Sequence, residues 1–258
     1  MKILKSHLVS ILKKGKREDE RELMDYRDID IKVNSIQRAN GSARVKLGKT
    51  EVIVGVKLDV GEPFPDTPDD GVQIVNAELN PLASPDFESG PPREEAIELA
   101  RVVDRTLREG KAIDMNKLCI TSGKKVWCVF IDIYPINAAG NLFDASALGA
   151  IIALKNARFP KYDKKTDEVK HEELTDKTLP INNIPILNTF GKIDGSILVD
   201  PSAREEKAID ARLSIATLEN GHICAMQKGN IGTLTIDDVN KLTKLTKKQG
   251  EKLRKFVQ

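Results

Sequence analysis

Three arginines at helical spacing are candidates for phosphate binding. Arg101, Arg105 and Arg108 lie four and then three residues apart, so a helix would align their guanidinium groups in one stripe. Each group stays charged at any relevant pH and can bind phosphate oxygens through two N–H donors, and a row of them can follow a polynucleotide backbone without reading its sequence. Glu98 and Asp104 are close enough in sequence to neutralise Arg101 and Arg108. The spacing therefore leaves both a phosphate-binding stripe and an ion-pair face open.

A second candidate site is acidic. Asp200, Glu205, Glu206 and Asp210 fall within one short segment just before a predicted strand. Carboxylates gathered in this way can hold Mg²⁺ or act as a general acid and base. The segment 200–202 (DPS) also resembles a turn that starts a helix, where acidic side chains in the first turn are favoured by the helix dipole. The local pattern favours this structural interpretation.

Composition and missing motifs exclude several classes of protein. The 258 residues include 41 Lys and Arg against 39 Asp and Glu, a net charge of +2, so any polyanion must bind to local basic clusters. The common signatures of dinucleotide binding, phosphate loops, serine hydrolases and zinc proteases are absent. The three cysteines form no CxxC pair, which argues against a disulfide framework and a structural zinc site. We expect no cofactor and no metal.

The chain has no apolar run near the length of about 20 residues that spans a bilayer. Its first residues form an amphipathic stretch rather than a signal peptide. We therefore expect a cytoplasmic protein that does not contact a membrane.

Hydrophobic periodicity predicts the elements that position these residues. Helices are predicted at 3–14, 93–108, 145–157 and 235–256. Strands are predicted at 31–33, 43–47, 52–60, 72–79, 118–120, 125–136, 184–190, 196–199, 213–218 and 222–227. The charged segment 162–177 is predicted as an insertion or connector. Blocks of mostly antiparallel strands that alternate with helices indicate an α+β fold.

Several segments together resemble the RNase PH family. They are 26–29 (YRDI), 39–52 (ANGSARVKLGKTEV), 199–202 (VDPS) and 213–216 (LSIA). The resemblance extends from about residue 20 to the C-terminus. Segments 91–95 (PPREE) and 98–105 (ELARVVDR) are more typical of one branch, the non-catalytic RNase PH-like subunit of the archaeal exosome core.

The resemblance implies a fold of two βαβα-like halves with mostly antiparallel or mixed sheets, a short N-terminal helix and a C-terminal helix. It divides the chain into an N-terminal helical extension at 1–19 and one RNase PH-like domain at 20–258, whose halves meet near 160–180. The implied activity is phosphorolysis, in which inorganic phosphate shortens RNA from its 3′ end and releases nucleoside diphosphates.

The loop that binds phosphate in catalytic members of the family is altered here. Those members carry an Ala-Asp-Gly-Gly-Thr-Arg-like run, whose backbone amides and Arg hold the anion. The corresponding segment of this chain is 138–144 (AAGNLFD). Phe143 stands where the Arg would be, and Asp144 adds a negative charge that repels phosphate. The resemblance thus implies a poor phosphate site.

The general acid of catalytic members also has no clear counterpart. The alignment places Arg212 where they carry Asp, and an Arg cannot cycle a proton. Catalytic members also carry a pair of arginines ahead of an Ile-Glu helix motif, and Glu94 and Glu95 replace these arginines here. A different gap could bring Asp210 or Glu206 into the position of the acid. On this alignment we assign no catalytic residue.

In the resembling branch, the helix arginines hold RNA by its backbone, which assigns that role to Arg101, Arg105 and Arg108. The resemblance then implies that the chain is an RNA-binding subunit of a hexameric ring, in which three heterodimers each pair it with a catalytic RNase PH-like paralogue. The further partners implied for the chain are the RNA-binding cap proteins of the exosome and single-stranded RNA. One alternative is an active phosphate-dependent 3′-to-5′ exoribonuclease that uses Asp210 or Glu206. Another is a metal-dependent hydrolase built on the carboxylates at 200–210.

Overall fold

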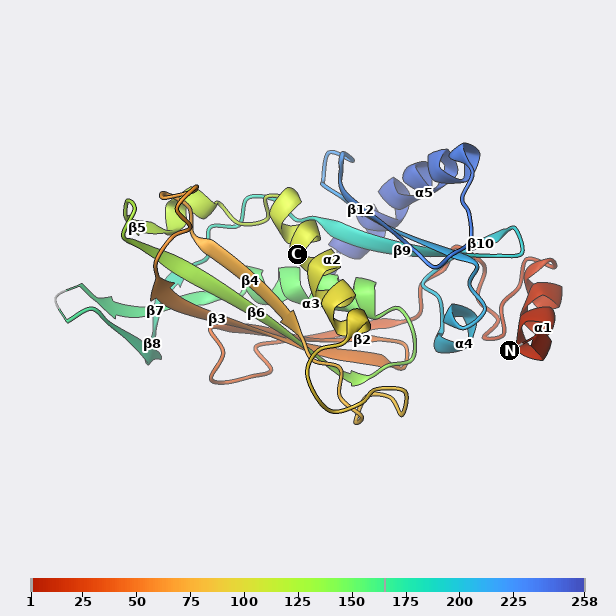
Figure 1. Ribbon diagram of the computed structural model, residues 1–258, viewed down its shortest axis with the longest axis horizontal. Coiled ribbons are helices and arrows are strands. Elements are labelled where there is room, and N and C mark those ends of the chain that lie inside the picture. The colour runs from red at the N-terminus through yellow and green to blue at the C-terminus, as the bar shows by residue number, and fades with distance from the viewer. Residues whose placement is uncertain (1, 165, 258) are drawn as a thin grey trace.

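Two β-sheets of unequal size organise the molecule, and helix α3 (Leu142–Lys155) packs against both of them (Figure 1). The computed structural model describes residues 2–164 and 166–257. Figure 1 shows an elongated chain in which the larger sheet and the smaller sheet lie on either side of the molecule's middle. The predicted α+β class is confirmed. None of the helices in these two ranges is long and apolar enough to cross a membrane.

The first half of the chain forms the larger sheet. Its strands are β1 (Ile29–Val33), β2 (Gly41–Leu47), β3 (Thr50–Gly61), β4 (Val72–Ala77), β5 (Cys119–Thr121) and β6 (Lys125–Asn137). They lie in the order β1-β2-β3-β6-β4, with β5 paired to β6. The pair of β4 and β6 is parallel and is joined through helix α2 (Glu94–Glu109), whereas the other pairs are antiparallel. The sequence β4-α2-β6-α3 is the expected βαβα arrangement.

The second half forms the smaller sheet, which is antiparallel throughout. Its strands are β9 (Ile186–Ile193), β10 (Ser196–Val199), β11 (Ala211–Thr217) and β12 (Ile223–Gly229), in the order β10-β9-β11-β12. Helices α4 (Ala203–Glu206) and α5 (Ile236–Arg254) follow β10 and β12. A capping box begins α5, because the Thr235 side chain accepts a hydrogen bond from the Asp238 backbone N–H at 3.1 Å and the Asp238 carboxylate accepts from the Thr235 backbone N–H at 2.9 Å.

Helix α1 (Lys2–Leu12) packs on the second half of the chain. Leu8 and Leu12 are buried in a small cluster with Ile193 and Leu198. This docking explains the amphipathic spacing at the N-terminus, since the apolar stripe covers the end of the smaller sheet.

The charged segment 162–177, predicted as an insertion or connector, belongs to a β-hairpin. Strands β7 (Arg158–Asp163) and β8 (Glu168–Thr178) pair with each other and extend from the end of the larger sheet (Figure 1). Most side chains of β8 are exposed, so hydrophobic alternation is missing. Backbone pairing and surface ion pairs such as that of Lys161 and Glu173, at 2.9 Å, define the hairpin instead.

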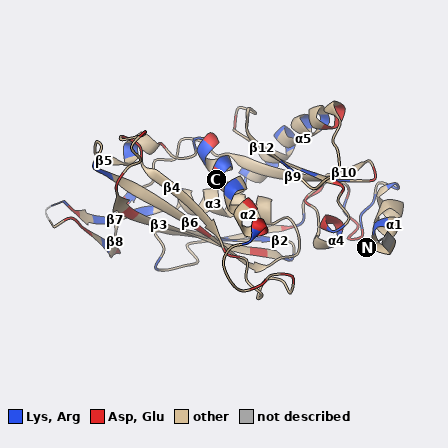
Figure 2. Cartoon of the chain, viewed as in Figure 1, with Lys and Arg blue, Asp and Glu red and all other residues tan. Residues whose placement is uncertain are grey.

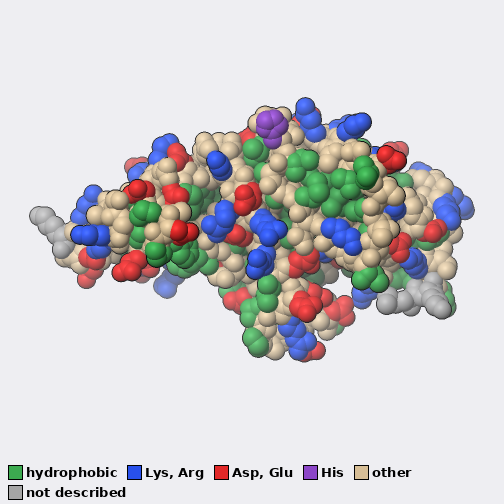
Figure 3. Space-filling model, turned by 45° about the horizontal axis from the view of Figure 1, so that its top comes forward, with side chains coloured by type: hydrophobic (Ala, Val, Ile, Leu, Met, Phe, Trp, Pro, Cys, Tyr) green, Lys and Arg blue, Asp and Glu red, His purple; other side chains and the backbone are tan. Residues whose placement is uncertain are grey.

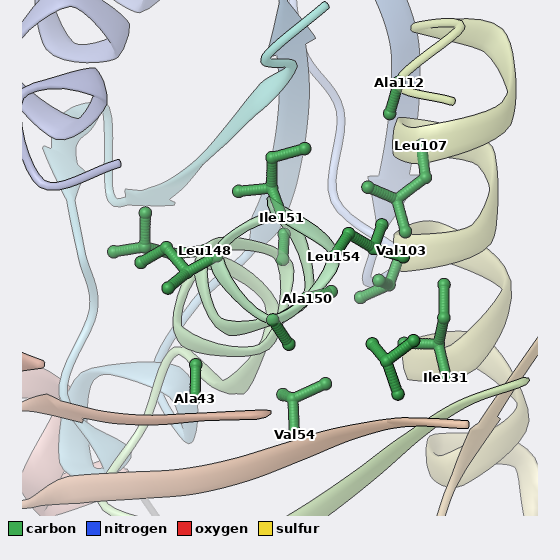
Figure 4. Close-up of a cluster of buried hydrophobic side chains, with 14 of the residues drawn as sticks. Ala43, Val54, Val103, Leu107, Ala112, Ile131, Leu148, Ala150, Ile151 and Leu154 are labelled. Carbon is green, nitrogen blue, oxygen red and sulfur yellow. The ribbon is translucent and has the colours of Figure 1, made fainter. Parts of the chain in front are cut away.

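The main core surrounds α3 on several sides (Figure 4). Val54 from β3 and Val103 from α2 approach different faces of the helix, and its own residues Ile151 and Leu154 are fully buried. A helix that is apolar nearly all round must be central. Because α3 packs against both sheets, the loop at its N-terminus lies where the two halves of the chain meet.

Candidate nucleic-acid interface

Helix α2 presents two of the three candidate arginines without internal partners. Leu99, Val103 and Leu107 bury one side of the helix. Arg101 and Arg105 lie on the exposed side, where neither side chain forms a hydrogen bond or ion pair with any part of the chain that the structure describes. Figure 2 shows the basic residues along α2 and acidic residues at its N-terminal end. Two fixed positive charges are therefore available to an external anion.

Arg108 differs from the other two. Its guanidinium Nη2 donates to Asp104 Oδ1 at 2.8 Å and to the Gln73 carbonyl at 3.0 Å. The hydrogen bonds that Arg108 donates to the Asp104 carboxylate raise the pKa of Arg108. The ion-pair alternative thus holds for Arg108, and this side chain is held away from the stripe.

Arg101 and Arg105 line a groove of about 410 Å³ between α2 and strands β11 and β12. We call it the arginine groove. Ile97 and Met226 contribute apolar surface to it and are 48% and 41% exposed. On the face shown in Figure 3, basic side chains lie beside an apolar patch near the middle of the molecule. Cations next to apolar surface suit a single nucleic-acid strand, which offers phosphates and base faces together.

Glu98 does not neutralise Arg101, although the two are neighbours on the helix. It forms an ion pair with Arg212 of β11. The Arg212 guanidinium also lies over the ring of Phe143, with its Cζ 4.3 Å from the ring centroid. The predicted alternative of an ion pair between Glu98 and Arg101 is therefore wrong.

The loop before α3 is occupied by the chain's own carboxylates. The Asn141 backbone N–H donates to Glu206 Oε1 at 2.7 Å, and the Asn141 side-chain Nδ2 donates to Asp144 Oδ2 and Asp200 Oδ1, both at 2.9 Å. Gly140 has a φ of +96°, and a Cβ there would lie 2.4 Å from the Ala203 backbone nitrogen. A glycine is needed for this close approach. The loop is thus closed against α4 by internal anions.

Burial shifts the acidity of two of these carboxyls. Desolvation raises the pKa of Asp144 to about 6, although Asn141, Thr189 and Tyr26 donate hydrogen bonds to it. Desolvation likewise raises the pKa of Glu206 to about 7. Both groups are close to titration near neutral pH.

Asp200 is neutralised by arginines from the N-terminal segment. Arg27 Nη2 lies 2.6 Å from Asp200 Oδ1, and Arg21 Nη1 lies 2.9 Å from Asp200 Oδ2. Burial alone would raise the pKa of Asp200, but the hydrogen bonds and charge of Arg27 outweigh it and lower this pKa. We call Asp200, Arg21, Arg27, Asn141 and Asp144 the Asp200 cluster.

The other acidic residues of this segment also have separate partners. Glu205 accepts from Arg17 Nε at 2.9 Å, and Asp210 forms an ion pair with Lys5. Over residues 2–164 and 166–257, no three His, Cys, Asp or Glu side chains are grouped so that they could hold a metal ion. The structure therefore does not bring the predicted acidic residues together as a metal centre.

Three of the residues that depart from the catalytic pattern, Glu95, Phe143 and Arg212, line one cavity. A cavity of about 310 Å³ next to the arginine groove is lined by Glu95, Phe143, Glu206 and Arg212, and Glu98 lines both spaces. Sequence reasoning named these residues one by one. It missed the contact between Phe143 and Arg212, because each was considered only as a replacement.

Comparisons with known proteins agree with this geometry. The models of the 3′ exoribonuclease family match residues 25–160 with domain 1 and residues 183–249 with domain 2. The chain belongs to this RNase PH family.

Among curated relatives, the "Exosome complex component Rrp42" of Thermococcus kodakarensis is 51% identical over 259 residues, covering 99% of this chain and 94% of the relative. The protein of the same name from Methanocella arvoryzae is 49% identical over 256 residues, covering 99% and 96%.

Two solved structures are also similar. A chain of the Archaeoglobus fulgidus exosome with RNA bound to the active site has a TM-score of 0.92 and 44% identity, covering 100% of this chain and 98% of that chain. A chain of an archaeal exosome core has a TM-score of 0.87 and 40% identity, covering 99% and 96%.

Proposed function

We propose that this chain is a subunit of an exosome core ring that holds RNA for a catalytic RNase PH-like paralogue and lacks a complete phosphorolytic site of its own. The observation that carries the proposal is the pair of exposed arginines, Arg101 and Arg105, which have no partner among the described residues and line one groove. Relatives named as exosome components and their likeness over nearly the whole chain support the assembly.

A phosphorolytic site must bind phosphate and supply a proton to the leaving 3′ oxygen. The backbone N–H of Asn141 already donates to the Glu206 carboxylate, and the apolar ring of Phe143 lines the same cavity as Glu206. Arg212 carries no proton that it can give up near neutral pH. These contacts support a subunit with no catalytic residues of its own.

The paralogue then supplies the phosphate site and the acid, and this chain supplies one wall of the RNA path. Three such heterodimers close into a six-membered ring, a heterologous arrangement that leaves no free end. We further infer contact with RNA-binding cap proteins, a cytoplasmic location, and the division into a 1–19 extension and a 20–258 RNase PH-like domain. The stripe of Arg101, Arg105 and Arg108 remains the proposed RNA contact, with Arg108 as its weakest member.

One observation favours the second candidate, an active phosphate-dependent exoribonuclease. Glu206 lines the 310 Å³ cavity, and burial raises its pKa to about 7. A carboxyl with such a pKa can act as a general acid at neutral pH. Its hydrogen bond to the loop before α3 makes a positioning role the simpler account.

The first test replaces both groove arginines, as Arg101→Gln/Arg105→Gln, in the ring reconstituted with its paralogue. Two lost phosphate contacts on a single strand should reduce the slope of log affinity against log salt by about 1.4 and weaken binding roughly 25-fold at about 0.1 M salt. Binding of a labelled oligoadenylate at several salt concentrations measures both quantities.

The matched control is Arg158→Gln, since Arg158 is an exposed arginine on β7 outside the groove. It should leave the slope unchanged. An unchanged slope in the double variant of an intact ring would refute the proposed RNA contact.

A further inference from the structure

Two departures from the catalytic pattern, Phe143 and Arg212, contact each other, and Arg212 also pairs with Glu98. The Arg212 guanidinium stacks on Phe143, with Cζ 4.3 Å from the ring centroid, and forms an ion pair with Glu98. The Arg212 side chain is 15% exposed, whereas that of Glu98 is 36% exposed. We call these three residues the Arg212 cluster.

Strand β12 leaves room for this guanidinium. Gly229 lies opposite Arg212 in the β11–β12 register, and a Cβ at Gly229 would lie 2.5 Å from Arg212 Nη2. The buried Nε of Arg212 has no hydrogen-bond partner within the described ranges, so the guanidinium is held mainly by Phe143 and Glu98. The cluster therefore holds the Arg212 guanidinium in a defined position at the border of the arginine groove.

The position of the Glu98 carboxylate decides whether Arg101, which lines the groove with Glu94, Glu98 and Arg105, has an anionic partner on its own helix. On a helix, residues three apart are neighbours, so Glu98 is in reach of Arg101. In the structure its carboxylate lies instead on Arg212, which comes from β11. Arg101 is left without an anionic partner for this reason, and two arginines of the groove, Arg101 and Arg105, remain unpaired among the described residues.

We propose that Arg212 is a positioning residue that holds Glu98 away from Arg101 and thereby preserves the RNA-binding charge of the groove. This inference rests on the proposed function. Arg212 itself makes no phosphate contact in this account, and it acts only through Glu98.

The test compares Arg212→Met, Glu98→Gln and the double variant in the reconstituted ring. Arg212→Met frees the carboxylate to neutralise Arg101, which should reduce the salt slope for oligoadenylate by about 0.7 and weaken binding roughly fivefold at about 0.1 M salt. Glu98→Gln alone should not weaken binding. The double variant should regain the wild-type slope, because no carboxylate is left to pair with Arg101.

A second pair of variants leaves Arg212 intact and covers the case in which Arg212→Met does not assemble. Glu98→Asp shortens the side chain, so its carboxylate should lose Arg212 and remain near Arg101. Its slope should fall, whereas the slope of Glu98→Gln should not. Arg212→Lys, which keeps a cation for Glu98, should stay close to the wild type. Size-exclusion chromatography confirms that each ring is intact.

Loss of binding in Arg212→Met without recovery in the double variant would overturn the inference, because Arg212 would then act directly or only through folding. A wild-type slope in both Arg212→Met and Glu98→Asp would overturn it as well. These outcomes are distinct from failure of the proposed function, in which Arg101→Gln/Arg105→Gln itself has no effect. In an Arg101→Gln background, Arg212→Met should cause no further loss.

Discussion

The Asp200 cluster and the arginine groove both contain several charged side chains, but they differ in whether those side chains have partners within the chain. In the Asp200 cluster, Asp200 is buried and binds Arg21 and Arg27, and Asn141 bridges it to Asp144. In the groove, Arg101 and Arg105 are exposed and have no partner among the described residues. Asp200 is paired within the chain, whereas the two groove arginines are left for a ligand.

This difference shows that residue type alone does not define a site. The acidic segment has the composition of a metal or acid–base centre, yet Asp200, Glu205 and Asp210 each pair with a different basic side chain. Internal pairing converts such groups into structural links, because a buried charge is tolerated only when it is paired. Unpaired groups on the surface remain free to bind.

The largest predicted effect is the loss of stability on breaking the Asp200 cluster. Asp200→Asn keeps the shape of the side chain and leaves Arg27 and Arg21, which are 10% and 12% exposed, without their anion. Removing one partner of a buried ion pair costs about 3 to 5 kcal/mol of unfolding free energy. Urea denaturation followed by circular dichroism measures the change.

The control is Asp176→Asn, because the Asp176 carboxylate is fully exposed and lies 3.9 Å from Arg158. It should change stability by less than about 0.5 kcal/mol. A similarly small change for Asp200→Asn would mean that the cluster is not the structural link described above.

A smaller effect should appear as a pH dependence that belongs to Asp144. Burial raises its pKa from 3.8 to about 6, so the folded protein holds a proton that the unfolded chain has released between these pH values. The contribution of Asp144 to the stability of the wild type therefore falls as pH rises through this window, and this loss is complete above about pH 6. Asp144→Asn cannot ionise and escapes this loss.

The free energy of unfolding of Asp144→Asn, relative to that of the wild type, should therefore rise by up to about 3 kcal/mol between about pH 4 and about pH 7. Urea titrations at several pH values measure this difference. Asp200, whose pKa is lowered, acts with the opposite sign but is present in both proteins. A difference that does not vary with pH would contradict the account of Asp144.

The smallest effect is expected for Arg108→Gln on RNA binding. Arg108 is held by Asp104 and the Gln73 carbonyl, so it offers little charge to a ligand. The salt slope of the ring should fall by less than about 0.3, well below the value of about 0.7 for one full contact with a single strand. A loss as large as that of Arg101→Gln would remove the distinction between paired and unpaired arginines on α2.

Most elements could be predicted from the sequence because their residues alternate or recur with the period of a strand or helix. Strand β3, whose buried and half-buried residues alternate, is one such case. The β7–β8 hairpin could not, since both faces of β8 are largely exposed and no period remains.

The partners in the candidate site were harder to predict. Arg27 and Asp200 are 173 residues apart, and Arg212 and Glu98 are 114 apart. The spacing of residues on a predicted helix suggests ion-pair partners only three or four residues away. It therefore suggested Arg101 as the partner of Glu98, and only the packing of α2 beside β11 and β12 reveals the actual pair.

The central claim is that this chain completes the catalytic site of a paralogue and has none of its own. The most direct measurement is phosphate-dependent release of nucleoside diphosphates from a labelled oligoribonucleotide, by the chain alone and after mixing with the catalytic RNase PH-like paralogue. The account predicts release only in the mixture and only with phosphate. Release by the chain alone with phosphate would contradict it and favour an active exoribonuclease, and phosphate-independent cleavage abolished by a chelator would favour the metal-dependent hydrolase.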